Sequence, residues 1–273
     1  MRFSRTRSRI GGSRWLGRIA WVGVAWSVAS GSHLAVAQDL VAKTEARSPA
    51  EEQKGFHLPA GFEIQLVASE PEILKPMNLA FDDRGRLWVT DSTEYPFPAA
   101  EGARTRDGVR ILEDFGPDGK ARKITTFTEG LNIPIGVLPR GRGAFVDSIP
   151  RIWWMEDTNG DGKADRKTPA YQTFGFRDTH GMASAFTWGF DGWIPACHGF
   201  SNDSTIQGAD GKTIKLNSGN TYRFRPDGSH VEQFTWGQVN PFGLAFDSLG
   251  NLYSCDCHSQ PVYCLLRGGY YPS

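Results

Sequence analysis

The sequence predicts an all-β protein, a β-propeller in which four to five blades are present. Glycine is frequent, with 32 in 273 residues, and aromatic residues are numerous, which favours short strands joined by tight turns. Strand–turn–strand units recur along the chain, and no helical periodicity is evident between residues 62 and 266. Two related turns lie 43 residues apart, a spacing that fits one four-stranded blade.

Three segments share the pattern of an apolar strand, a glycine turn and a second apolar strand: residues 79–91, 185–196 and 244–255. Their turns contain Asp or Gly, which tolerate the backbone of a tight hairpin. Residues 111–123 and 154–166 form a second repeat, and residues 222–234 a related hairpin around Pro-Asp-Gly. A β-sandwich would also have short strands, but it would not return the same unit at this spacing.

Residues 58–273 are assigned to the propeller. The 212 residues from Phe62 to Ser273 have room for four to five blades at this period. A propeller closes into a ring, so that its terminal blades leave no open edge. We therefore expect an incomplete six-bladed ring in a chain truncated at its C-terminus, and a genuine five-bladed ring is the alternative.

Residues 1–37 have the three-part pattern of a secretory signal peptide. Arginines precede an apolar run at residues 19–29, and Ala35-Val36-Ala37 forms a cleavage site. The run is shorter than the ~20 residues of a bilayer-spanning helix, and an uncleaved anchor is the alternative. We expect residues 38–57 to be a flexible lead-in, the protein to be periplasmic or on the cell surface, and the mature chain to have no membrane span.

The neutral formal charge of the chain conceals an asymmetry. Residues 1–37 contain six arginines and no acidic residue, which leaves residues 38–273 with 24 basic and 30 acidic side chains, a net charge of −6. A nucleic-acid-binding protein needs clustered Lys and Arg to neutralise phosphates. We therefore expect no nucleic-acid partner.

The four cysteines are Cys197, Cys255, Cys257 and Cys264. In an exported protein they can form disulfides, and the sequence does not choose among the three possible pairings. Zinc is an alternative, because Cys197 and Cys257 are each followed by a histidine, although no C-x-x-C pair is present. The segment from Cys255 to His258 is one residue short of C-x-x-C-H, so no haem is expected in this chain.

One acidic loop has the residue order of a calcium-binding loop. Its predicted ligands are the side chains of Asp157, Asn159, Asp161 and Asp165 and the carbonyl of Lys163. Calcium prefers six to eight oxygen ligands, so water or another loop must complete the shell. An acidic hairpin tip without an ion is the alternative. The related loop at residues 114–122 lacks two of these ligands and carries an arginine, so we expect it to be empty.

Four segments together resemble the N-terminal propeller of the planctomycete-type "membrane-bound dehydrogenase" proteins: residues 61–71, 143–153, 157–165 and 256–273. In that family the propeller precedes helical repeats and a c-type cytochrome domain with a C-x-x-C-H site. The resemblance covers roughly residues 55–273. It implies that electrons pass to a cytochrome domain that this chain lacks.

The propeller more distantly resembles the quinoprotein glucose, sorbosone and aldose-sugar dehydrogenases, which use pyrroloquinoline quinone (PQQ) and calcium. Residues 180–194 match their pattern of a histidine, an apolar strand, a G-x-D-G turn and a strand. In those enzymes the histidine removes the substrate hydroxyl proton, which implies that His180 is the catalytic base. Imidazole titrates near neutrality and suits this role. A histidine that only bonds a neighbouring loop is the alternative.

The same resemblance provides one residue for the cofactor. An R-N-x-Q-G run of the quinoproteins corresponds to residues 239–243, which keep Asn240 and Gly243 but have Val239 and Phe242 in place of Arg and Gln. Arginine pairs with a carboxylate through its planar fork, and PQQ has three carboxylates. Asn240 is therefore a cofactor-binding candidate in a site that departs from the PQQ pattern.

Two functions are compatible with these features. The first is an exported propeller module of a sugar or alcohol dehydrogenase, with His180 as its base. The alternative is a non-catalytic, calcium-stabilised propeller that binds a carbohydrate or a protein partner. Four residues at predicted strand ends could form a polar cluster at the central pocket that His180 is expected to line: Asp91, Glu94, Asp256 and His258.

Overall fold

Short strands joined by glycine turns account for almost all the regular structure in the part of the chain that the structure describes. The computed structural model describes residues 45–100 and 102–272, where it has seventeen strands and one helix. The all-β prediction is confirmed. The predicted signal peptide lies outside the described residues. Residues 47–273 form one structural unit, to which the following description refers.

The helix, α1 (Pro49–Gln53), lies within the predicted lead-in. It forms because Ser48 and Glu51 make a capping box, in which each side chain bonds the backbone amide of the other residue. None of its residues is buried. Within the described part of the chain, no helix has the length and apolar character needed to cross a membrane.

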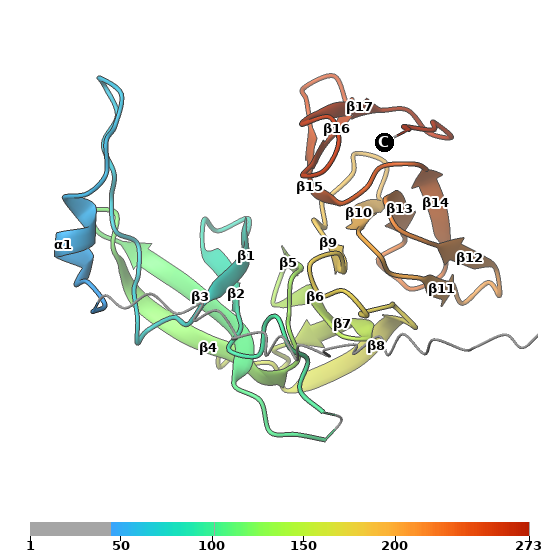
Figure 1. Cartoon of the computed structure of the whole chain (residues 1–273). Coiled ribbons are helices and arrows are strands. Elements are labelled where there is room, and N and C mark those ends of the chain that lie inside the picture. Colours follow the sequence, from blue (N-terminus) through green and yellow to red (C-terminus); the bar gives the residue numbers. More distant parts are fainter. Residues whose placement is uncertain (1–44, 101, 273) are drawn as a thin grey trace, which may run out of the picture. The chain divides into compact units, whose positions relative to one another are not determined.

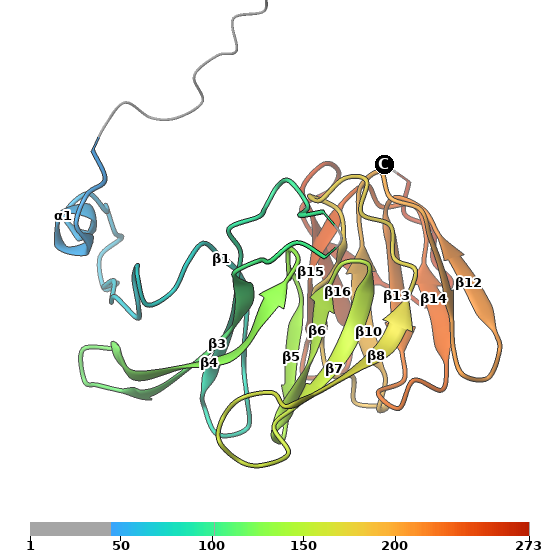
Figure 2. The same ribbon diagram turned by 90° about the horizontal axis from the view of Figure 1, so that it is seen from below.

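Four antiparallel sheets form the blades of a β-propeller (Figures 1 and 2). Blade 1 contains β1 (Pro76–Phe81), β2 (Leu87–Asp91), β3 (Asp107–Phe115) and β4 (Ala121–Leu131). Blade 2 contains β5 (Val137–Arg140), β6 (Gly143–Ser148), β7 (Arg151–Glu156) and β8 (Arg166–Gln172). Blade 3 contains β9 (Ala183–Ser184), β10 (Ile194–His198), β13 (Asn220–Phe224) and β14 (Val231–Thr235). Blade 4 contains β15 (Pro241–Phe246), β16 (Leu252–Asp256) and β17 (Tyr263–Leu265).

The predicted hairpins coincide with strand pairs, with one difference. Residues 79–91 and 244–255 form β1–β2 and β15–β16, whereas in residues 185–196 the first strand is reduced to β9. Ala185 follows β9 with φ of 55°, a left-handed backbone that ends the strand. The rest of the turn is held by isolated backbone hydrogen bonds, such as that from the Gly189 amide to the Trp193 carbonyl (2.9 Å).

One further hairpin, which was not predicted from the sequence, lies between β10 and β13. It consists of β11 (Ser204–Gln207) and β12 (Thr213–Leu216), and it forms a two-stranded sheet of its own. Both strands have four residues, and polar side chains alternate with Ile206 and Ile214. Strands this short carry too little periodicity to be predicted.

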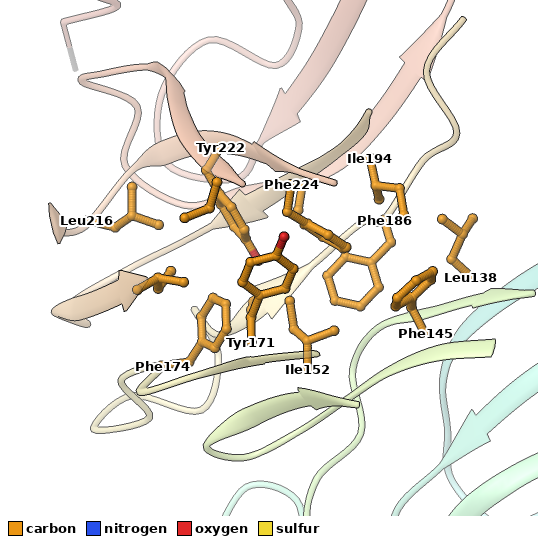
Figure 3. Close-up of a cluster of buried hydrophobic side chains, with 14 residues drawn as sticks. Leu138, Phe145, Ile152, Tyr171, Phe174, Phe186, Ile194, Leu216, Tyr222 and Phe224 are labelled. Carbon is orange, nitrogen blue, oxygen red and sulfur yellow. The ribbon is translucent and has the colours of Figure 1, made fainter. Parts of the chain in front are cut away.

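Apolar side chains between neighbouring blades form the core. One cluster joins blades 1 and 2 around Trp88, Phe127 and Met155. A second joins blades 2 and 3, where Figure 3 shows the rings of Phe145, Tyr171, Phe174, Phe186, Tyr222 and Phe224 packed together. The Tyr171 hydroxyl in this cluster lies 2.9 Å from the carbonyl oxygens of Arg225 and His230.

A buried polar residue lies at the end of the second strand of every blade, or one residue before it. It lies six positions after the glycine of the preceding turn, at Asp91, Asp147, His198 and Asp256. Asp91 pairs with Pro76 and Asp256 with Pro241, so these two have the same register. Because each second strand ends beside the start of the first strand, all four side chains lie at one end of the propeller. This repeat position is called the strand-end position below.

Candidate functional site

A pocket of about 530 Å³ opens at the end of the propeller where the first strands of the blades begin. We call it the mouth pocket. Met77 at the start of β1, His180 before β9 and Asn240 before β15 all line it, so residues far apart in sequence meet there. Its aromatic lining is Tyr95, Phe200 and Phe242, and its polar lining is Asp178, Thr179, His180, Asn240, Cys257 and His258.

His180 forms a pair with a carboxylate from its own loop. Its Nδ1 lies 2.8 Å from Asp178 Oδ1, and its backbone amide donates to the same oxygen over 2.9 Å. Burial alone would raise the pKa of Asp178, but these hydrogen bonds from His180 hold that pKa below its usual value. An ionised carboxylate only accepts hydrogen bonds, so Nδ1 carries the proton and Nε2 is left as the basic nitrogen.

The loop that carries this pair is fixed by a buried asparagine. Asn202 accepts a hydrogen bond from the Asp178 amide (3.1 Å) and donates to the carbonyls of Asp178 and Gly181 (2.7 and 3.0 Å). Gly181 allows the loop to approach the chain at Phe200, because a Cβ there would lie 2.2 Å from the Phe200 nitrogen. The sequence reasoning missed Asp178 and Asn202, although the Asp-Thr-His order was a usable signal for the first.

Asn240 joins three loops of the pocket. Its Oδ1 accepts from the Phe200 amide (3.0 Å), and its Nδ2 lies 3.3 Å from both the His180 carbonyl oxygen and Cys257 Sγ. The loops near residues 180 and 240 therefore share one rim of the pocket. The polar atoms of Asn240 are thus bonded to the protein, and the residue positions the walls of the pocket.

Asp256 holds Asn240 in place. Its carboxylate accepts from the amides of Val239 (2.9 Å), Asn240 (3.1 Å) and His258 (2.9 Å). The His258 ring lies at a tilt to Phe200, with centroids 5.9 Å apart. The predicted polar cluster is therefore correct for these two residues, of which His258 lines the pocket and Asp256 supports it.

The other two members of that predicted cluster lie elsewhere. Asp91 is fully buried in blade 1, where it accepts from Arg110 Nε (3.0 Å) and from the Leu74 amide (3.2 Å). Glu94 uses its backbone amide to bond Asp107 (3.2 Å), and it does not line the mouth pocket. Strand-end placement alone was insufficient, because it does not show which side chains are already paired within a blade.

The aromatic lining includes a tyrosine, Tyr95, whose ring lies edge-on to the imidazole of His180. The rings of Tyr95 and His180 have centroids 5.5 Å apart and planes at 74°. Burial and the nearby charge of Asp178 raise the pKa of Tyr95, so its phenol stays protonated and can donate a hydrogen bond. Aromatic faces beside hydrogen-bonding groups suit a ligand that has both C–H and O–H surfaces.

The predicted calcium ligands lie in the loop between β7 and β8. Asp157 accepts from the Gly160 and Gly162 amides (2.5 and 2.9 Å), while Asp165 bonds the hydroxyl of Thr158. Asn159 and Asp161 each accept from the amide two residues later, that of Asp161 and that of Lys163 (both 2.9 Å). Residues 45–100 and 102–272 contain no cluster of three or more His, Cys, Asp or Glu side chains that could hold a metal ion. The loop as described does not gather its carboxylates around one point.

All four cysteines are free thiols in the structure, so none of the possible disulfides is formed. Cys197 is buried in β10, and burial followed by the nearby Cys255 thiol raises its pKa. Cys257 lies at the mouth pocket. His198, next to Cys197, is bonded through Nδ1 to the Asn217 carbonyl (2.9 Å) and through Nε2 to Ser204 (2.7 Å). Both of its ring nitrogens are therefore engaged by the protein.

The lining of the mouth pocket does not fit PQQ. The described lining carries two histidines and one aspartate but no Lys or Arg. The three carboxylates of that cofactor would have no permanent cation to pair with. The residues that replace the quinoprotein Arg and Gln are Val239, whose amide bonds Asp256, and Phe242, which forms part of the apolar wall.

Comparison with known protein families shows which family the chain belongs to. The family described as a domain of unknown function, DUF7133, matches residues 48–272. The chain belongs to this family. The DUF7133 chain is also similar to two solved sugar dehydrogenase structures. A comparison with curated proteins gave no match.

One of these structures is the holo form of the PQQ domain of pyranose dehydrogenase from Coprinopsis cinerea, with a TM-score of 0.53 and 14% identity over 77% of the DUF7133 chain and 55% of that domain. The other is PQQ-bound aldose sugar dehydrogenase from Streptomyces coelicolor, with a TM-score of 0.48 and 17% identity over 76% and 64% of the two chains. The DUF7133 chain thus spans between half and two thirds of the length of each. At 14% identity, the likeness to the pyranose dehydrogenase domain shows the propeller fold alone.

Proposed function

We propose that the mouth pocket binds a sugar or a related alcohol and that His180 accepts the proton of one of its hydroxyls during oxidation. The observation that carries this proposal is the Asp178–His180 pair at the rim of a pocket lined by aromatic and polar side chains. Asp178 keeps the proton on Nδ1, and Nε2 is then available as the base. The named activities of the two similar propellers, both sugar dehydrogenases, support the substrate class.

Oxidation of an alcohol carbon releases one proton and one hydride. In the proposed reaction the C–H bond breaks, the hydride passes to a two-electron acceptor of the quinone class, and the O–H proton passes to His180. Because the lining does not fit PQQ, we propose that the acceptor is supplied from outside the pocket. Export of the protein and electron transfer to a c-type cytochrome belong to the same proposal. Export rests on the signal-peptide pattern of residues 1–37, and the cytochrome partner rests on the sequence resemblance.

Binding without chemistry is the second candidate function. It is favoured by the lack of Lys and Arg in the described lining, since a bound quinone cofactor would need them. The two candidates differ in one measurable property, because both predict sugar binding but only the first predicts electron transfer to an acceptor.

The test is steady-state reduction of a quinone-type dye by the full-length protein with a panel of sugars and alcohols, alongside calorimetric binding of the same compounds. His180→Gln should lower kcat by about 100-fold or more with little change in KM, because only proton transfer is lost. Asp178→Asn should lower kcat by about tenfold and move its pH profile, because the tautomer is no longer fixed.

His230→Gln is the matched control. It removes a histidine that also pairs with an aspartate, Asp210 (2.5 Å), but that lies outside the mouth pocket. It should leave kcat unchanged. Sugar binding without dye reduction would replace the dehydrogenase by the binding module, and the absence of both would overturn the proposed function.

A further inference from the structure

A second pocket, of about 350 Å³, opens beside the mouth pocket between blades 1 and 2. The loop after β2 contributes Tyr95 to the mouth pocket and Ala99 to the second pocket. The segment before β9 contributes Asp178 to the first and Phe176 to the second. Ile149, which lines the second pocket, belongs to the same apolar cluster as Tyr95. The two pockets therefore lie at one end of the propeller and share a wall.

Two cations of the second pocket lie over a single indole. Lys167 Nζ is 4.2 Å from the centroid of the Trp153 ring, and the guanidinium carbon of Arg151 is 5.5 Å from it. Within residues 45–100 and 102–272, neither cation has a carboxylate within salt-bridge distance. The side chain of Arg151 donates a hydrogen bond to Gln172 (3.2 Å), a neutral group. We call this the cationic pocket.

The pair differs from Arg223, a cation that stacks on a tryptophan in blade 3. There Arg223 lies 4.4 Å from the centroid of Trp193 and is also paired with Asp191 (2.7 Å) and Glu232 (2.6 Å). Lys167 has no such compensation. Partial burial of the Lys167 ammonium group, and then the charge of Arg151, lower the pKa of Lys167. Both cations line the same pocket, so an anion bound there would be attracted by both charges.

We propose that the cationic pocket binds an oxyanion, either a carboxylate or a sulfate, carried by the sugar unit next to the one in the mouth pocket. Arginine offers a planar fork that matches such a group in a bidentate manner, and lysine adds a mobile point charge. The proposal rests on the proposed function and narrows its substrate class from sugars in general to acidic oligosaccharides.

The experiment compares trigalacturonate with its fully methyl-esterified form by isothermal titration calorimetry on the full-length protein. The two ligands share their sugar rings and differ only at the carboxyl groups, which are charged in the acid and are neutral methyl esters in the other form. We expect the acid to bind about tenfold more tightly than the ester, because a charged hydrogen bond to Arg or Lys is worth that factor. The advantage should shrink as salt is added, since the pocket is open to solvent.

Lys167→Met and Arg151→Gln should each lower the affinity for the acid towards that of the ester without changing the affinity for the ester. Lys215→Met, which removes an exposed lysine of β12, is the matched control and should retain the full difference. Equal affinities of acid and ester in the native protein would overturn the proposal. An unchanged acid preference in both pocket variants would also overturn it.

A thermal unfolding series with sodium sulfate separates this proposal from the proposed function. If sulfate stabilises the native protein but not Lys167→Met, and no sugar binds, the proposed function and the acidic-sugar proposal both fall, and a site for a free inorganic anion replaces them. If the ester binds but neither the acid preference nor the stabilisation by sulfate is present, only the proposal for the cationic pocket is overturned.

Discussion

Blades 4 and 2 carry the same residue at the strand-end position, and the two blades use it in opposite ways. Asp256 of blade 4 accepts three backbone amides and thereby fixes the loops of the mouth pocket. Asp147 of blade 2 is fully buried, and neither of its carboxylate oxygens has a hydrogen-bond partner within the described chain. The two blades therefore place a carboxylate at the same repeat position, but its role differs. That role depends on whether a neighbouring loop offers backbone amides to the carboxylate.

The largest effect is expected for Asp256→Ala. Loss of a carboxylate that accepts three amides should lower the free energy of unfolding by about 4 kcal/mol and abolish sugar binding, because the loop around Asn240 loses its anchor. Urea unfolding and calorimetry measure the two effects. Asp256→Asn keeps one acceptor oxygen and should lose about half as much stability. A loss below about 1 kcal/mol for Asp256→Ala would contradict the anchoring role.

His198 occupies the strand-end position of blade 3, and it predicts a pH effect. Burial lowers its pKa from 6.5 to about 4. The unfolded imidazole therefore gains a proton below about pH 6.5 while the folded one stays neutral, so stability is lost as the pH falls towards 4. We expect a loss of about 3 kcal/mol from this group between pH 7 and pH 4.

The measurement is urea unfolding at a series of pH values. His198→Gln should make the profile flatter over that range, because the buried imidazole is removed. Identical slopes in the native protein and His198→Gln would show that the buried imidazole does not account for the acid sensitivity.

The loop of Asp157 also contains a carboxylate bonded to backbone amides, as Asp256 is. If the sequence pattern binds calcium with the affinity of extracellular modules, 10 mM calcium should stabilise the protein by about 2 kcal/mol. Differential scanning calorimetry measures this shift. Asp161→Ala should remove it, and Asp118→Ala, in the related loop at residues 114–122, should not. The absence of any calcium-dependent shift would overturn the prediction and leave a loop closed by its own hydrogen bonds.

The smallest effect is expected for Asp147→Asn. Burial raises the pKa of Asp147 well above 3.8, so above that pH the unfolded carboxyl releases its proton while the folded one retains it. Stability is therefore lost as the pH rises. Removal of the titrating group should raise Tm at pH 7 by roughly 2–4 °C, with no gain near pH 4. A lower Tm at pH 7 would show that a charged Asp147 has a stabilising partner.

The fold was largely predictable because glycine turns and alternating strands are local properties. The hairpins around Gly85 and Gly250 could be placed from sequence, since each turn needs a left-handed glycine between two apolar strands. The short strand before Ala185 and the β11–β12 insertion could not, because one depends on a single backbone angle and the other on four-residue strands.

The candidate site was predictable only in part. The fold brings His180 and Asn240 to one rim because both precede the first strand of a blade. Which polar groups remain available to a ligand depends on contacts made across the fold. Asn240 is engaged by Phe200 and Cys257, and Asp91 is engaged by Arg110, and neither pairing follows from sequence spacing.

The short separation of Asp178 and His180 has a consequence for how heat would affect the protein. Both side chains belong to one loop, so a change in the spacing between blades would alter the width of the mouth pocket without separating Asp178 from His180. Ligand affinity and proton transfer should then respond to temperature independently. On warming, ligand affinity would fall first, while the alignment of the imidazole with Asp178 would persist until that loop unfolds.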